Sequence, residues 1–137
     1  MQTTLSFERG FLAELSADDR ARLFAHARIV SFADGEDILS AGDDALDAYA
    51  VIEGRAEAAL YSSGGRLVLY RDLLPGDVFG ELALLDGGPR TTFVVARGPV
   101  RAALLSKRAF EALLVEAPGV SRALLAQLAG SIRRLTE

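Results

Sequence analysis

The segment "FGELALLDGGPRTT", residues 79–92, joins a short apolar run to a glycine-rich loop and a single arginine. Its part "GELALL" lacks the alternation of a strand and is too short to be stable as an isolated helix. We therefore expect one to two helical turns there, set between strands. Gly80 allows a ligand to approach the backbone closely at the start of these turns, where exposed amides favour an anion.

Two charged residues of this segment suit different parts of a sugar phosphate. Arg90, which follows a Gly-Gly-Pro loop, offers a forked cation that matches phosphate oxygens. Glu81 is acidic, so we expect it to accept hydrogen bonds from a hydroxyl, as an acidic residue does for the ribose in dinucleotide sites. Anion site, hydroxyl acceptor and short loop together predict a pocket for a compact sugar phosphate.

The sequence around this segment predicts a β-rich fold. From Ile29 to Ser106, short apolar or alternating runs follow one another, and most of them end at turn residues. Runs of strand length at such close spacing are typical of an all-β sandwich or barrel. The sequence "LPGD", residues 74–77, suits a type II turn with Pro75 and Gly76 at its central positions.

Helices are expected at both ends of the chain. Ser16 is a good N-cap for a first helix, and Ser106 can cap another that stops before Pro118. Leucines at helical spacing predict a last helix from about Val120 to Arg134. The expected fold class is mainly β with flanking helices.

We expect one domain over all 137 residues. Its helical N-terminus would extend to about residue 28, its β-roll over about 29–106 and its C-terminal helices over about 107–136. Within the roll, residues 79–92 would form the ligand-binding segment.

Composition and charge narrow the classes of function. The net charge of −4 and the pI near 5 argue against an autonomous nucleic-acid-binding face. The chain has no cysteine, so disulfides and thiolate metal sites are excluded. Glu8, Arg9 and Glu14 interrupt any signal-peptide core, and no apolar run reaches the roughly 18 residues of a membrane span. We therefore expect a cytoplasmic protein that binds neither membrane nor nucleic acid directly.

Residues 75–96, "PGDVFGELALLDGGPRTTFVVA", resemble the phosphate-binding cassette of cyclic-nucleotide-binding domains. This family includes bacterial catabolite activator proteins, cyclic-nucleotide-dependent kinases and cyclic-nucleotide-gated channels. The Gly-Glu pair, the intervening length and the Pro-Arg-Thr sequence all agree with the cassette. The segment "DGEDILSAGDDALDAYAVIEGRAEA", residues 34–58, and the flanking helices extend the resemblance over nearly the whole chain.

The resemblance implies a β-roll of the double-stranded β-helix, or jelly-roll, type that binds a cyclic nucleotide. Glu81 would bind the ribose 2′-hydroxyl, and Gly80 would allow the ribose to come close. The backbone amide of Ala83 and the guanidinium of Arg90 would hold the cyclic phosphate. Thr91 would contact the phosphate, and in the family a threonine there can also bond the amino group of a syn guanine.

The resemblance implies less specific roles for three further residues. Leu73 aligns with an apolar position that faces the base, and Arg71 would share its face of the strand. Thr92 departs from the more usual alanine. The expected ligand-binding set is Gly80, Glu81, Leu82, Ala83, Arg90, Thr91, Thr92, Leu73 and Arg71.

The leading expectation is a regulatory sensor of cyclic AMP whose C-terminal helices move on binding, with cyclic GMP as the alternative ligand. A structural relative that has lost its ligand is a second class, but the intact Glu81 and Arg90 argue against it. A cupin-like enzyme is a third class, which a single histidine and no cysteine make a poor one. We expect no catalytic residue, no metal and no cofactor beyond the ligand.

The output of such a sensor would have to come from elsewhere. Catabolite activator proteins continue into a helix-turn-helix domain, whereas this sequence ends at Glu137. The sequence is therefore expected to be a stand-alone bacterial-like module or a fragment of a larger protein. A homodimer or an effector protein bound through the last helix would be its macromolecular partner.

Overall fold

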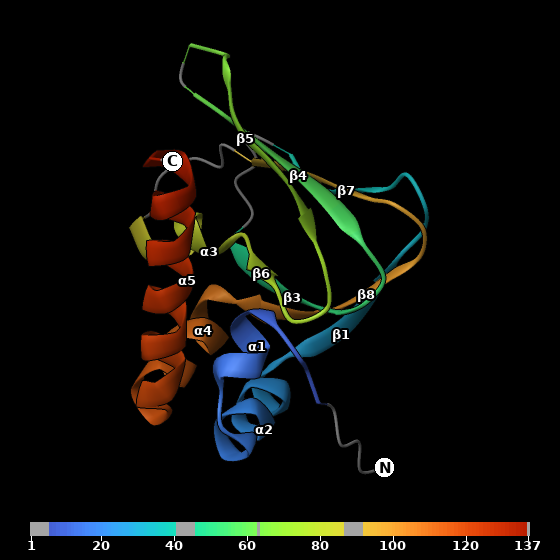
Figure 1. Ribbon diagram of the computed structural model, residues 1–137. Helices are drawn as coiled ribbons and strands as arrows, with labels where there is room; N and C mark the ends of the chain where they lie inside the picture. Colours follow the sequence, from blue (N-terminus) through green and yellow to red (C-terminus); the bar gives the residue numbers. More distant parts are fainter. Residues whose placement is uncertain (1–5, 41–45, 63, 87–91, 137) are drawn as a thin grey trace.

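The structure, a computed structural model, describes residues 6–40, 46–62, 64–86 and 92–136. Helices cover one side of a pair of β-sheets (Figure 1). The elements in chain order are α1 (Gly10–Glu14), α2 (Ala17–His26), β1 (Arg28–Phe32), β2 (Asp37–Leu39), β3 (Asp47–Glu53), β4 (Ala56–Tyr61), β5 (Leu67–Leu73), β6 (Val78–Phe79), α3 (Glu81–Asp86), β7 (Thr92–Ala96), β8 (Val100–Ser106), α4 (Lys107–Glu116) and α5 (Pro118–Thr136).

Two antiparallel four-stranded sheets form the β-roll. Sheet A has the strand order β1-β8-β3-β6, and sheet B has the order β2-β7-β4-β5. In sheet A, β8 pairs with both β1 and β3, so that Leu104 lies opposite Arg28 on one side and Tyr49 on the other. The expected fold class, mainly β with flanking helices, is confirmed.

Sheet A is the middle layer of the molecule, and β3 shows why its sequence is almost continuously apolar. Ala48, Ala50 and Ile52 belong to the core that sheet A shares with the helices. Tyr49 and Val51 belong to the second core, between the two sheets. Both faces of β3 are therefore buried, and a strand of this kind carries apolar residues at successive positions instead of alternating.

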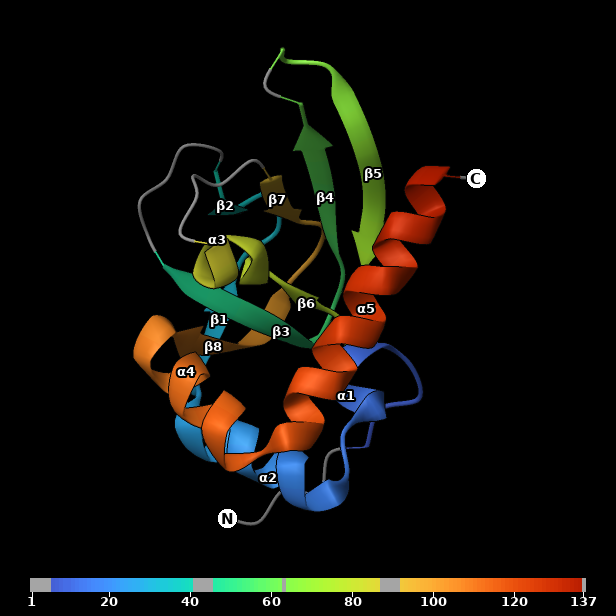
Figure 2. The ribbon, with the colours of Figure 1, turned by 90° about the vertical axis from the view of Figure 1, so that its left-hand side faces the viewer.

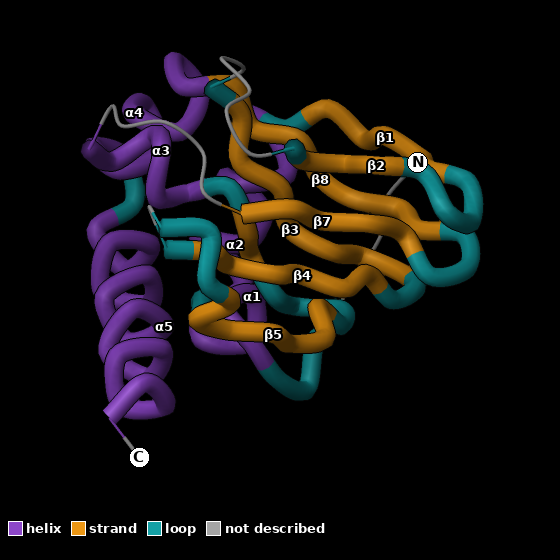
Figure 3. The backbone as a smooth tube through the Cα atoms, turned by 90° about the horizontal axis from the view of Figure 1, so that it is seen from above, coloured by secondary structure: helices purple, strands orange, loops and turns teal. Residues whose placement is uncertain are grey.

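The helices gather at one side of the strands, as the view from above shows (Figure 3). In the core that they share with sheet A, α1 packs with α5, and α2 packs with α4. The N-caps are those expected: the Ser16 hydroxyl accepts from the Asp19 amide, and the Ser106 hydroxyl accepts from the Ala109 amide. The C-terminal helices pack beside the N-terminal ones (Figure 2).

Two helical features differ from the sequence-based expectation. Within the expected helical N-terminus, α1 was not predicted as a separate helix, because five residues are too few to show a helical period. The last helix begins at Pro118 instead of Val120 and extends to Thr136. Proline is favoured in the first turn of a helix because its missing N–H would have no intrahelical partner there.

The turn at residues 74–77 fastens the N-terminal segment to the roll. Gly76 has φ +102° and the Asp77 amide donates to the Leu74 carbonyl at 2.9 Å, as the predicted type II turn requires. A side chain at Gly76 would collide with the Arg9 carbonyl. The backbone of residues 9–12 can therefore lie directly on the turn, and the Leu12 amide donates to the Gly76 carbonyl at 2.9 Å.

Among the described residues, no single helix has the length and hydropathy to cross a membrane. The segments Lys107–Glu116 and Pro118–Arg133 meet the criteria as a pair, by length and composition only, with a bend of 111° between them.

Candidate functional site

Glu81 lies where a sheet strand changes into a helix. Strand β6 pairs with β3, and the ring of Phe79 stacks on that of Tyr49 with centroids 5.1 Å apart. Gly80 then adopts φ +84°, a backbone conformation that residues other than glycine rarely adopt. Glu81 is the first residue of α3, so the predicted short helix between strands is confirmed.

The Glu81 carboxyl group is buried, with only 7% of the residue exposed. Burial raises the pKa of this carboxyl above its ordinary value, because the charged form loses its hydration. Its backbone hydrogen bond, the charge of Arg71 and a hydrogen bond from Gln127 act in the opposite direction on the pKa. A buried acidic acceptor of this kind suits a hydroxyl donor in a site that excludes water.

Gln127 brings helix α5 into contact with the candidate site. Its Nε2 atom lies 3.2 Å from Glu81 Oε2 and 3.3 Å from the carbonyl oxygen of Val78. A side-chain amide has two N–H donors, and here each has an acceptor. The reversed amide would turn its own oxygen towards a carbonyl and a carboxylate, so only this orientation satisfies the contacts.

Three of the other predicted residues lie on strands of sheet B. Leu73, at the end of β5, is completely buried in the core between the sheets, which also contains Phe79. Arg71 is partly buried on the same strand, and its charge acts on Glu81. Thr92 begins β7, pairs with Leu60 and is partly buried.

The other predicted positions cannot be assigned contacts. Arg90 and Thr91 lie outside the described residues. Leu82 and Ala83 belong to helix α3, but their side chains lie outside what the structure describes. The roles expected of these four residues therefore stay predictions.

Gln127 is the residue of the site that the sequence reasoning missed. It lies on the stripe of α5 that includes Val120, Ala123, Leu124 and Leu128, at helical spacing i, i+3, i+4, i+7 and i+8. All four of these neighbours pack in the core shared with sheet A. A single polar residue within an apolar stripe indicates a buried hydrogen-bond partner, and this signal was present in the sequence.

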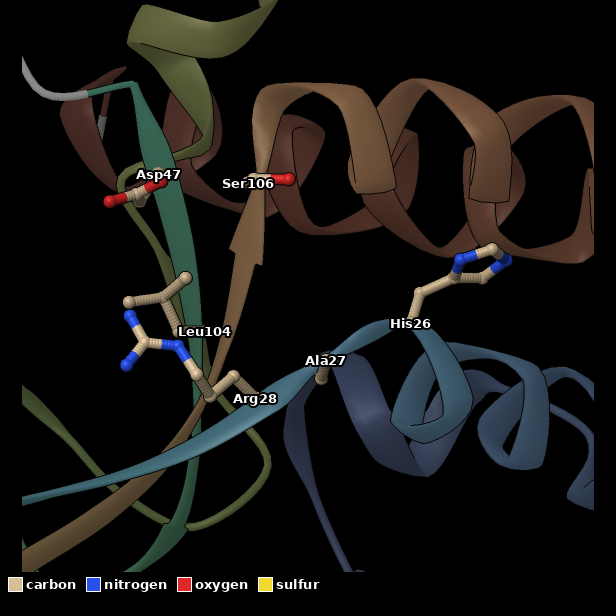
Figure 4. Close-up of a pocket in the computed structure, with 6 residues that line it drawn as sticks. All are labelled: His26, Ala27, Arg28, Asp47, Leu104 and Ser106. Atoms are coloured by element: carbon tan, nitrogen blue, oxygen red, sulfur yellow. The ribbon is translucent and has the colours of Figure 1, made fainter.

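A separate hollow of about 290 Å³ lies at the junction of α2, β1, β3 and β8 (Figure 4). Its lining is His26, Ala27, Arg28, Asp47, Leu104 and Ser106. None of the predicted ligand-binding residues is among them. His26 contacts Glu116 at 3.0 Å between Nε2 and Oε1, and this contact links α2 to α4. Within the described ranges, no group of three or more histidine, aspartate or glutamate residues could hold a metal ion.

The chain belongs to the cyclic nucleotide-binding domain family, whose model matches residues 29–117. It is 35% identical over 111 residues to the cAMP-dependent protein kinase regulatory subunit of Mycosarcoma maydis, covering 77% of this chain and 21% of that protein. The chain spans between about a fifth and a half of the length of the curated relatives it matches. These relatives are regulatory proteins.

Solved structures show the same fold. The catabolite activator protein of Thermus thermophilus superposes with a TM-score of 0.79 at 27% identity, over 90% of this chain and 58% of that one. The regulatory domain of Toxoplasma gondii protein kinase A, crystallised with cAMP, superposes with a TM-score of 0.71 at 30% identity, over 88% and 45% of the two chains. The expected family is therefore confirmed.

Proposed function

We propose that this chain is a regulatory sensor domain that binds cyclic AMP, without catalysing a reaction and without a cofactor. The observation that carries the proposal is the buried carboxyl group of Glu81, placed at the start of α3 in a domain of this family. A carboxylate that is 7% exposed keeps its charge at a cost, and a ribose hydroxyl would supply a compensating hydrogen bond.

The remaining contacts follow the family resemblance. The cyclic phosphate would be held by the Ala83 amide, the Arg90 guanidinium and Thr91. Arg71 and Leu73 would face the nucleotide from β5, with Gly80, Leu82 and Thr92 beside it. Cyclic GMP is the alternative ligand, because the Thr91 hydroxyl could form a hydrogen bond with the amino group of a syn guanine. We propose that the protein is cytoplasmic, in the same compartment as its cyclic-nucleotide ligand.

Ligand binding would be passed on by the C-terminal helices. Helix α5 contacts the site directly through Gln127, so a change at Glu81 reaches α5 without an intermediate residue. An effector protein or a second copy of the chain would then recognise the altered position of α5.

Calorimetric titration of the purified chain with cyclic AMP and cyclic GMP tests the proposal. We expect saturable binding with one site per chain, and Glu81→Ala should weaken it. Glu57→Ala is a matched control, because Glu57 is a carboxylate that pairs with the exposed Arg55 and Arg97 and is not among the predicted ligand-binding residues. Absence of binding by both nucleotides at millimolar concentration would rule the function out.

A further inference from the structure

The Glu81 carboxylate is already engaged by helix α5. Gln127 Nε2 lies 3.2 Å from Glu81 Oε2, and Glu81 is only 7% exposed. A ribose hydroxyl can reach a carboxylate that is this buried only if one of the groups covering it moves away. One of the groups in contact with Glu81 must therefore move when the ribose binds.

The groups that act on Glu81 differ in how easily they can leave. Its backbone hydrogen bond is fixed by α3, and Arg71 belongs to β5, which is paired with β4 along its length. Gln127 belongs to α5, which pairs with no strand of the roll. Its side chain can turn away after breaking two hydrogen bonds, to Glu81 and Val78, while every strand pair stays intact.

We propose that Gln127 and the ribose 2′-hydroxyl compete for Glu81, so that the hydroxyl displaces the Gln127 amide and thereby releases the middle of α5 from the site. This inference rests on the proposed function. It assigns Gln127 two roles that the family resemblance did not: it lowers the affinity for a ribonucleotide, and it makes the position of α5 depend on the sugar. A ligand that lacks the 2′-hydroxyl would bind without disturbing Gln127.

The chain is well suited to a direct test by nuclear magnetic resonance. It contains two glutamines, Gln2 and Gln127, and no asparagine. The spectrum therefore holds only two side-chain amide groups, and a Gln2→Ala variant assigns them. We expect saturating cyclic AMP to shift the Gln127 side-chain signals and saturating 2′-deoxy cyclic AMP to leave them in place. Equal responses to the two ligands, or no response to either while both bind, would overturn the inference.

Binding measurements on Gln127→Met provide the second readout, since methionine keeps the length of the side chain and removes its donors. Because a hydrogen bond to a charged group no longer has to be broken, cyclic AMP should bind about 10- to 150-fold more tightly. The 2′-deoxy analogue should change by less than about 2-fold. Weaker binding of cyclic AMP would show that Gln127 orients Glu81 for the ligand, and an equal change for both ligands would show a general effect on α5. Either result contradicts competition.

Arg122→Ala is the matched control, because Arg122 is an exposed residue of the same helix. At about 0.15 M salt the charge of this exposed residue is partly screened, and both affinities should stay close to those of the unmodified chain. The outcomes also separate the inference from the function on which it rests. If neither cyclic nucleotide binds the unmodified chain, both fail. If they bind and Gln127→Met does not favour cyclic AMP, only the inference fails.

Discussion

Arg9 and Asp77 lie 68 positions apart in the sequence and form a bidentate pair, with Nη1 to Oδ2 and Nη2 to Oδ1 both at 3.0 Å. Asp77 is almost fully buried, at 3% exposed, and its Oδ2 also accepts from the Leu74 amide at 2.9 Å. The pair closes the turn that directly precedes β6. It therefore anchors the N-terminal segment next to the strand that leads to Glu81.

Arg9→Ala should destabilise the fold, because it leaves the buried Asp77 carboxylate without its cation. Leaving a buried polar group without its partner lowers the free energy of unfolding by about 1–3 kcal/mol. Arg9 itself is half-exposed, so we expect an effect within that range and not above it. Urea unfolding would measure it. Arg22→Ala is the control, since Arg22 pairs with Asp19 on the surface and should change the unfolding free energy by less than about 0.5 kcal/mol. Equal effects of the two substitutions would contradict the role given to Asp77.

Arg90→Ala should nearly abolish binding of the cyclic nucleotide while the fold is kept. Truncating one partner of a buried charge pair costs about 2–5 kcal/mol, which corresponds to roughly 30- to several-thousand-fold in affinity. Calorimetry measures the affinity, and circular dichroism checks the fold. Arg97→Ala, which removes an exposed arginine bound to Glu57, should leave the affinity unchanged. Unchanged affinity of a folded Arg90→Ala protein would remove the phosphate site from the proposal.

Thr91→Ala should decide between the two bases. If its hydroxyl bonds the amino group of a syn guanine, cyclic GMP should lose about 0.5–1.5 kcal/mol more than cyclic AMP. If the hydroxyl serves only the phosphate, both ligands should lose the same amount. Competition with a fluorescent cyclic nucleotide would give both values. A larger loss for cyclic AMP than for cyclic GMP would contradict both models.

The raised pKa of Glu81 predicts a pH dependence of stability. The native state holds the Glu81 proton more tightly than the unfolded chain, so the free energy of unfolding falls as pH rises from the ordinary value of 4.5 through the native pKa. Glutamine at position 81 does not titrate, so the Glu81→Gln variant does not lose stability in this way. Its unfolding free energy, relative to that of the unmodified chain, should rise between pH 4.5 and 7. Urea unfolding at several pH values would show it.

Glu57→Gln provides the control for that experiment. Hydrogen bonds from Arg97 and Tyr70 lower the pKa of Glu57 to about 2, so its contribution to stability is lost only as pH falls below 4.5 towards 2. The difference in unfolding free energy between Glu57→Gln and the unmodified chain should therefore not change between pH 4.5 and 7. A flat difference for Glu81→Gln as well would mean that Glu81 does not bind its proton more tightly in the native state.

Helix α5 should respond to ligand in hydrogen–deuterium exchange. Val120, Ala123 and Leu124 are buried in the core, so we expect the change to concentrate after Gln127. If α5 covers the base once Gln127 has left Glu81, amides from there to about residue 135 should exchange more slowly with cyclic AMP than without it. Deleting the residues after 128, which keeps the buried part of α5 and Gln127, should weaken binding without removing the phosphate site. Identical exchange in both states, with full affinity after truncation, would make α5 a static part of the core.

The sequence predicted those features that depend on neighbouring residues. Ser16 and Ser106 cap their helices as expected, because a cap and its amide lie three residues apart. The helix at Glu81 was predicted from a break in strand alternation. The two-residue strand β6 was not predicted, since it has no period of its own and exists through its pairing with β3.

Contacts between distant segments could not be predicted in this way. Gln127 and Glu81 are 46 positions apart, and only the packing of α5 against the roll brings them together. The same holds for Arg9 and Asp77, whose pairing needs the turn at Gly76 and the close approach of residues 9–12. Both contacts are charge-assisted hydrogen bonds with a buried carboxylate, which local patterns do not reveal.

The central position of β8 in sheet A has a consequence for how the chain folds. The hairpin of β4 and β5 joins neighbours in the sequence, but β1 and β3 are held together only through β8, which is the last strand of the roll. Pairings between distant strands form slowly because a long loop must close first. During synthesis, β1 therefore has no partner strand, and β3 can pair only with β6, until Ser106 has left the ribosome. Sheet A, and with it the site at the end of β6, is therefore completed late, after all of the strands have been made.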